Sequence, residues 1–200
     1  MQDESPPEHN DPKTAPEPVS RLGLLLIDLQ DTFLRTIPGH EDLINRVSFA
    51  VSVASRLGCP VAATEQSPDK LGPINETLHS LLRDPERIFP KTGFSALSAD
   101  GISEWIENHP IDHLLIAGIE SPVCVYQTAV DAVSAGVGAT VLSDCIGERR
   151  HCDRQPVLNQ LLAMDVHILP AETIFYSLLG SSDHEAFRDY TRLVKRYSDS

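Results

Sequence analysis

Short apolar runs alternate with longer amphipathic segments from residue 22 to the end of the chain. In the segment 41–57, apolar side chains recur at helical spacing, and Gly58 follows as a C-terminal stop. The pattern predicts strands at residues 22–27, 60–64, 87–89, 112–119, 138–142 and 166–169. It predicts helices at residues 41–57, 76–83, 99–108, 123–135, 153–163, 173–179 and 185–197. Residues 66–73 are expected to form a loop.

Alternating strands and helices are typical of an α/β fold. Consecutive parallel strands need a crossover connection, which is usually a helix, so the pattern predicts a parallel sheet covered on both faces. A length of 200 residues suits a single domain with a sizeable core.

The first 20 residues have a different composition from the rest of the chain. They contain five prolines, five acidic residues and one lysine, with almost no apolar side chain. Such a segment buries too little apolar surface to offset the entropy lost on ordering. We therefore expect a disordered, acidic, proline-rich tail at residues 1–20 and one globular domain at residues 21–200.

Charge and cysteine content narrow the class of protein. The net charge of -13 argues against partners such as nucleic acids and anionic membrane surfaces. No apolar run approaches the roughly 20 residues that span a bilayer, and no signal peptide precedes the predicted domain. Four irregularly spaced cysteines are too few for a disulfide scaffold in a chain of this length. These features predict a cytoplasmic protein.

Chemically reactive side chains follow several of the predicted strands. Asp28 follows the first strand, Lys91 the third and Cys124 the fourth; residues 65–66 follow the second and residues 144–145 the fifth. In open parallel sheets the ligand site lies beyond the carboxyl ends of the strands. We therefore expect a carboxylate, an amine and a thiol to meet at one edge of the sheet.

Cys124 is the candidate nucleophile. It would lie at the start of a helix, where backbone N–H groups and the helix dipole favour the thiolate. Asp28 can accept the thiol proton, and Lys91 would offset the negative charge of Asp28. His113 begins a strand and would lie at the wrong end of the sheet. Each residue alone also has a structural explanation, as a core cysteine, a turn cap or a solvated lysine, but their convergence favours a site.

Four segments of the sequence together resemble a known family. They are Asp-Leu-Gln-Asp-Thr-Phe at 28–33, Thr-Glu-Gln at 64–66, Phe-Pro-Lys-Thr-Gly-Phe-Ser at 89–95 and Gly-Ile-Glu-Ser-Pro-Val-Cys at 118–124. In this order and spacing they resemble the isochorismatase-like cysteine hydrolases, over residues 22–197. The forms at 64–66 and 118–120 look like the subgroup of isochorismatase domain-containing proteins.

The resemblance implies a fold and a set of site residues. The fold would be a Rossmann-like, three-layer α-β-α sandwich around a six-stranded parallel sheet. Asp28, Lys91 and Cys124 would form a catalytic triad. A cis peptide bond between Ile119 and Glu120 would aim the N–H groups of Glu120 and Cys124 at an oxyanion. Members of the family commonly form homo-oligomers, so a dimer or tetramer is expected.

The implied reaction is hydrolysis of a C–N amide bond in a small molecule through a thioester on Cys124. Residues 64–68 read Thr-Glu-Gln-Ser-Pro where nicotinamidases of this family carry an Asp-x-His metal motif. We therefore expect no metal and no cofactor. Isochorismatases proper cleave a vinyl ether and typically lack the cysteine. Two alternatives stay open: vinyl-ether hydrolysis, and a catalytically silent binding or regulatory module.

Residues near the predicted strand ends are candidates for the walls of a substrate pocket. Aromatic side chains among them could equally be core residues, and this applies most to Tyr126. The candidates are Phe33, Gln66, Phe94, Glu120 and Tyr126.

The cysteines other than Cys124 have mainly structural interpretations. Cys59 lies beside a predicted helix end, and Cys152 lies in a charged loop. Cys145 follows a predicted strand, so it could line the pocket or pack in the core.

Overall fold

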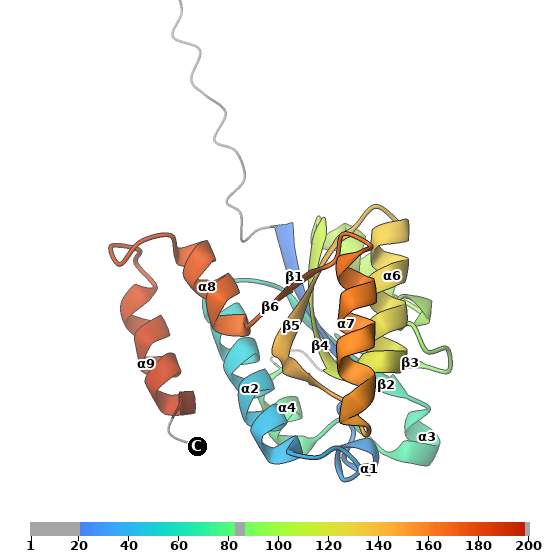
Figure 1. Cartoon of the computed structure of the whole chain (residues 1–200). Helices are drawn as coiled ribbons and strands as arrows, with labels where there is room; N and C mark the ends of the chain where they lie inside the picture. The colour runs from blue at the N-terminus through green and yellow to red at the C-terminus, as the bar shows by residue number, and fades with distance from the viewer. Residues whose placement is uncertain (1–20, 83–86, 199–200) are drawn as a thin grey trace, which may run out of the picture.

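A computed structural model describes residues 21–82 and 87–198. Six parallel strands form one sheet in the order β3-β2-β1-β4-β5-β6 (Figure 1). The strands are β1 (Leu22–Ile27), β2 (Val61–Gln66), β3 (Ile88–Lys91), β4 (His113–Ile119), β5 (Gly138–Gly147) and β6 (His167–Leu169). The predicted α/β class and the six-stranded parallel sheet are confirmed.

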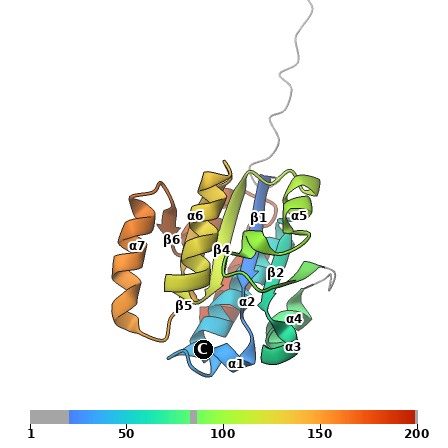
Figure 2. The same cartoon turned by 90° about the vertical axis from the view of Figure 1, so that its right-hand side faces the viewer.

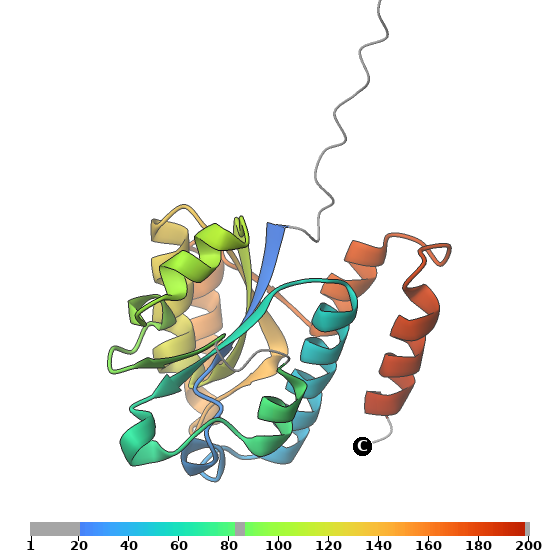
Figure 3. The same cartoon turned by 180° about the vertical axis from the view of Figure 1, so that it is seen from behind.

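Helices cover both faces of the sheet. Helices α2 (His40–Arg56), α4 (Glu76–Leu81), α8 (Ala171–Leu179) and α9 (Phe187–Ser198) lie on one side, as Figures 1 and 3 show. Helices α5 (Ile102–Asn108), α6 (Tyr126–Ser134) and α7 (Arg154–Leu162) lie on the other, and Figure 2 looks onto them. Two further short helices, α1 (Asp31–Leu34) and α3 (Pro68–Leu71), follow β1 and β2.

The core consists of two apolar clusters, one on each face of the sheet. Successive side chains of a strand point to opposite faces, so Leu24 and Leu26 of β1 join the α2 side, while Leu25 and Ile27 join the α6 side. All four are completely buried. The uninterrupted apolar sequence of β1 is thus that of a strand covered on both faces.

Several element boundaries differ from those predicted. Strand β5 continues to Gly147, because its pairing with β4 shifts register between Ile116 and Gly118 and then resumes. Strand β2 includes Gln66, which was expected in a loop. Helix α5 begins at Ile102 after a 3₁₀ turn, three residues later than predicted.

Two predictions fall wholly or partly outside the described residues. These are the tail at residues 1–20 and the end of the helix predicted at 76–83, which the structure follows as α4 up to Leu81. Within residues 21–82 and 87–198, no helix combines the length and apolar character needed to cross a bilayer.

Candidate active site

Asp28 is held at the carboxyl end of the central strand β1. Its backbone has a positive φ of 54°, which turns the chain sharply out of the strand. The Asp28 N–H donates to the carbonyl oxygen of Thr64 at 3.1 Å, and the Thr64 hydroxyl donates to Oδ1 of Asp28 at 2.9 Å. One oxygen of a buried carboxylate is therefore fixed by the neighbouring strand β2, and Oδ2 is left for a second partner.

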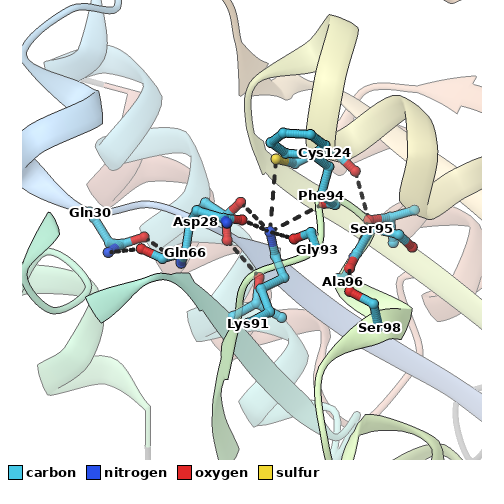
Figure 4. A network of polar contacts seen from close by, with 12 residues as sticks. Asp28, Gln30, Gln66, Lys91, Gly93, Phe94, Ser95, Ala96, Ser98 and Cys124 are labelled. Carbon is cyan, nitrogen blue, oxygen red and sulfur yellow. Dashed lines mark hydrogen bonds and ion pairs between the residues drawn. The ribbon is translucent and has the colours of Figure 1, made fainter. Parts of the chain in front are cut away.

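Lys91 supplies that second partner from the edge strand β3. Its side chain crosses the end of β2 and places Nζ 2.7 Å from Oδ2 of Asp28. Nζ also donates to Oε1 of Gln66 at 2.6 Å and to the carbonyl oxygens of Gly93 and Phe94 at 3.1 and 3.2 Å (Figure 4). This set of oxygen acceptors compensates the buried ammonium group for the loss of water.

Cys124 completes the group from the other side of β1. It lies in a π-helical turn, Ser121–Val125, which joins β4 to α6 and leaves Cys124 only 8% exposed. Its Sγ atom is 3.8 Å from Nζ of Lys91 (Figure 4). The three side chains that the strand-end pattern grouped are therefore adjacent, although they come from β1, β3 and the turn after β4.

Burial dominates the electrostatics of the thiol. Desolvation, followed by the negative charge of Asp28, raises the pKa of Cys124 to about 12, and this outweighs the lowering effects of Lys91 and of the Glu120 backbone N–H. The backbone N–H group before the helix does favour the thiolate, as expected, but burial and the charge of Asp28 outweigh it in the resting protein. The thiol keeps its proton and hydrogen-bonds to Asp28.

Asp28 is also shifted towards its neutral form. Burial raises the pKa of Asp28 above 3.8, while the charge and hydrogen bond of Lys91 lower it. A carboxylate with a raised pKa is a better proton acceptor than a solvated one. The pair can therefore pass a proton from the thiol to the carboxylate.

The turn before Cys124 has unusual backbone geometry. The peptide bond between Ile119 and Glu120 is cis. Gly118 has a φ of 131°, and a Cβ atom there would meet the main chain of Ile27. Strands β4 and β1 thus approach each other closely just before the chain turns towards the thiol.

A cavity of about 210 Å³ opens onto Cys124 and Asp28. Four of the predicted pocket residues line it, and Phe94 among them is 56% exposed. Tyr126 does not line it, because its side chain packs against the apolar cluster on the α6 side. The lining residues are Asp28, Phe33, Gln66, Phe94, Ile119, Glu120, Val123, Cys124 and Arg149.

Three lining residues were not expected from the sequence. Ile119 ends β4, and Val123 lies in the turn that carries Cys124. Arg149 comes from the segment after β5, and its Nε donates to Oε1 of Glu120 at 2.7 Å. No local pattern marks this arginine, because its contact depends on how two distant segments meet.

Asp144 and Cys145 do not join this cavity. Asp144 accepts a hydrogen bond from Nη2 of Arg46 at 2.6 Å and one from the Ala171 N–H at the start of α8 at 2.8 Å. Cys145 is fully buried in the core cluster on the α2 side, so of its two possible roles the structure supports core packing. The two residues follow the predicted strand but lie within β5, which runs five residues further than predicted.

The described part of the chain offers no evident metal site. Among its His, Cys, Asp and Glu side chains, no group of three or more is arranged to hold a metal ion. At the cavity, Lys91 already fills the position next to Asp28 that a cation would take.

Comparison with known proteins agrees with this geometry. The family model described as the isochorismatase domain matches residues 23–173. Isochorismatase domain-containing protein 2 of Xenopus laevis is 27% identical over 172 residues, which cover 86% of this chain and 82% of the relative.

Two solved structures extend the comparison to the fold. The MAR1 ribonuclease of Caenorhabditis elegans superposes with a TM-score of 0.83 at 28% identity, over 88% of this chain and 90% of that one. YcaC of Escherichia coli, an octameric hydrolase of unknown specificity, has a TM-score of 0.79 at 18% identity, over 90% of this chain and 95% of that one. Since the domain match spans more than half of the 200 residues, the chain belongs to the isochorismatase family of hydrolases.

Proposed function

We propose that this protein is a metal-independent cysteine hydrolase that cleaves the C–N amide bond of a small molecule. The supporting observation is the buried contact of Lys91 with both Asp28 and Cys124, at 2.7 and 3.8 Å, beside a cavity. A thiol, a proton acceptor and a fixed positive charge are the groups that acyl transfer through a thioester requires.

The first half of the reaction forms the acyl-enzyme. Asp28 takes the thiol proton as Sγ of Cys124 attacks the amide carbon, and the carbonyl π electrons move onto oxygen. The backbone N–H groups of Glu120 and Cys124 are proposed to receive this oxyanion. The oxyanion then collapses, the C–N bond breaks, and Asp28 returns its proton to the leaving nitrogen. The products are an amine or ammonia and a thioester on Cys124.

The second half restores the thiol. A water molecule adds to the thioester carbon while Asp28 accepts one of its protons. The C–S bond then breaks, the carboxylic acid leaves, and Sγ of Cys124 recovers a proton from Asp28. Lys91 keeps its proton throughout and lowers the cost of each negative charge that forms beside it.

The cavity supports a small, uncharged substrate with an apolar body. Its walls are formed largely by Phe33, Phe94, Ile119 and Val123. Arg149 in its lining is already paired with Glu120, and Lys91, outside the lining, is paired with Asp28. A charged substrate would have to displace one of these pairs, whereas a neutral amide would not.

A nucleic acid is not the substrate proposed. The C. elegans neighbour is named a ribonuclease, but this chain carries a net charge of -13. Proteins that bind a phosphate backbone rely on lysine and arginine. A cavity of about 210 Å³ also suits a small molecule better than a polymer.

A screen of small amides and carbamoyl compounds tests the proposal. Ammonia or amine release is measured for the wild type and for Cys124→Ala, Asp28→Asn and Cys152→Ala. Matched substrates that differ by one carboxylate test the preference for a neutral ligand. Cys124→Ala and Asp28→Asn should abolish turnover. Cys152→Ala is the matched control, since Cys152 is exposed and is not part of the cavity lining, and it should keep wild-type activity.

Intact-protein mass spectrometry adds a test of the intermediate. A rapidly quenched reaction should show the mass of the acyl group on the wild type and none on Cys124→Ala. Turnover that survives Cys124→Ala would overturn the thioester route and favour vinyl-ether hydrolysis or another direct mechanism. Binding without turnover across the screen would favour a binding or regulatory module.

Assembly and location are part of the same proposal. The expected homo-oligomer, a dimer or tetramer, is supported by the family resemblance, and the E. coli neighbour is itself described as an octamer. Light scattering after size-exclusion chromatography should give a multiple of 21.9 kDa, and a mass near 21.9 kDa would refute association. Four free thiols support a reducing, cytoplasmic location, which subcellular fractionation would check.

A further inference from the structure

Glu148 is a buried carboxylate that takes no part in the proposed reaction. It directly follows β5 and is only 7% exposed. Its Oε2 atom accepts a hydrogen bond from Nη1 of Arg154 at 2.9 Å and one from the hydroxyl of Ser121 at 2.8 Å. A buried charge without a partner is costly, so these two contacts fix where the carboxylate lies.

Arg154 anchors this carboxylate to the end of β5. Besides Glu148, its guanidinium donates to the carbonyl oxygen of Ile146 at 3.2 Å and to that of Ser143. The rigid, multidentate guanidinium therefore joins the sheet to Glu148. Helix α7, which begins at Arg154, packs against the π-helical turn.

Ser121 connects the same carboxylate to the turn that carries the nucleophile. It is fully buried and lies between Glu120 and Cys124. Its single hydroxyl proton is shared between Oε2 of Glu148 and the carbonyl oxygen of Gly147, which are 2.8 and 3.0 Å away. A cavity of about 290 Å³, separate from the one at Cys124, is lined by Gly147 and Glu148. Cys124 and Val125 at the end of the turn pack in the apolar cluster on the α6 side, whereas Ser121 at its start is held by these two polar contacts.

We propose that Glu148 is a positioning residue that acts through Ser121 to hold the π-helical turn in place. That turn keeps the backbone N–H of Glu120 in contact with the sulfur of Cys124. This inference rests on the proposed role of Cys124 as the nucleophile. Glu148 itself is outside the lining of the Cys124 cavity, so it would affect the thiol only through the turn.

The test is the pH profile of Cys124 alkylation by iodoacetamide, followed by peptide mass spectrometry, in Glu148→Gln and Ser121→Ala. Loss of the Glu120 N–H contact removes a group that favours the thiolate. The profile should therefore move to higher pH, and the rate at pH 8 should fall about fivefold or more, the factor expected for one hydrogen bond. Alkylation of the exposed Cys152 in the same samples should be unchanged.

A double-variant cycle separates positioning from general destabilisation. If Glu148 acts through Ser121, the variant carrying both changes should be alkylated at Cys124 no more slowly than Ser121→Ala alone. His151→Ala is the matched control, because His151 approaches the same carboxylate at 3.5 Å from a 91% exposed position; its rate should stay within about twofold of wild type.

Two results would overturn the proposal. One is a wild-type pH profile in folded Glu148→Gln and Ser121→Ala proteins. The other is full additivity of the effects of Glu148→Gln and Ser121→Ala on the rate of Cys124 alkylation in the double variant. If Glu148→Gln does not fold, Ser121→Ala decides alone, since it leaves the Glu148–Arg154 pair in place. Alkylation needs no substrate, so a wild type that is alkylated but hydrolyses no amide would refute the proposed reaction without deciding the role of Glu148.

Discussion

Asp28 and Lys91 form a 2.7 Å ion pair in which the two side chains are only 2% and 0% exposed to solvent. Removing one partner of such a pair leaves an uncompensated charge in the protein interior, which costs more than the pair itself contributes. The pair therefore links the stability of the fold to the chemistry proposed for the cavity.

Lys91→Met should destabilise the protein by about 3–5 kcal/mol, because the buried Asp28 would lose its charged partner and keep only the Thr64 hydroxyl and the weakly donating Cys124 thiol as side-chain donors. Urea unfolding at neutral pH, followed by circular dichroism, measures the change. Arg149→Met is the matched control, since the Arg149–Glu120 pair is largely exposed on the arginine side and its loss should leave the midpoint unchanged. Equal midpoints for both variants would contradict the importance assigned to burial.

Asp28→Asn should have opposite effects on the two reactions of Cys124. The charge and hydrogen bond of Asp28 both raise the pKa of the thiol, so their removal should speed iodoacetamide alkylation at pH 8 by about tenfold, the equivalent of one pKa unit. Amide hydrolysis should be abolished, because the proton acceptor is lost.

The exposed Cys152 provides an internal control for this comparison, and its alkylation should not respond to Asp28→Asn. In the wild type, alkylation of Cys124 should keep rising up to pH 10 without a plateau, because the pKa of its thiol is about 12. A plateau near neutral pH would mean that the resting thiol is ionised, contrary to the electrostatics of the site. A parallel loss of alkylation and hydrolysis in Asp28→Asn would instead indicate a general collapse of the site.

The strand-end pattern identified Asp28, Lys91 and Cys124 because it depends only on topology. Once a parallel sheet is predicted, residues that follow its strands must lie at one edge. The resemblance then singled out the Ile119–Glu120 bond, which composition and periodicity do not mark. The buried residues of β1 and α2 could also be predicted from the sequence. The apolar run of β1 and the helical spacing of apolar residues in α2 are uninterrupted.

Tertiary contacts decided the features that were predicted wrongly, left open or not predicted. Strand β5 extends to Gly147 only because β4 shifts register beside it, and this extension carries Cys145 into the core. Val123 in the π-helical turn lines the cavity, whereas Tyr126 at the start of α6 packs against the apolar cluster. Arg149 reaches Glu120 across 29 residues of sequence. No local pattern encodes any of these relationships.

The loss of hydrolytic activity at acid pH should follow the protonation of Asp28. Burial raises the pKa of this carboxyl above 3.8, so the native protein binds the proton at a higher pH than the unfolded chain. The contribution of Asp28 to the free energy of unfolding should therefore increase as pH falls through the native pKa, while hydrolysis is lost over the same window. Carboxyl ¹³C NMR titration, assigned with Asp28→Asn, measures the midpoint.

Lys91→Met provides the matching test of the cause, because Lys91 lowers the pKa of Asp28 in the wild type. The Asp28 midpoint should move further upward in this variant. A midpoint at or below 3.8 in the wild type would contradict the dominance of burial, and an unchanged midpoint in Lys91→Met would contradict the coupling.

Gly118→Ala should disrupt the approach to the nucleophile turn. Gly118 has a φ of 131°, and a new Cβ would meet the carbonyl group of Ile27 on the adjacent central strand. Backbone strain and steric overlap together should destabilise the fold by about 3–5 kcal/mol in urea unfolding.

Gly136→Ala is the control for this prediction. Gly136 also has a positive φ, 79°, but it has open space around it, so the substitution should cost about 1 kcal/mol. Equal losses in the two variants would show that backbone conformation alone matters. A larger loss at Gly118 would instead show that the contact between β4 and β1 sets the position from which the chain turns towards Cys124.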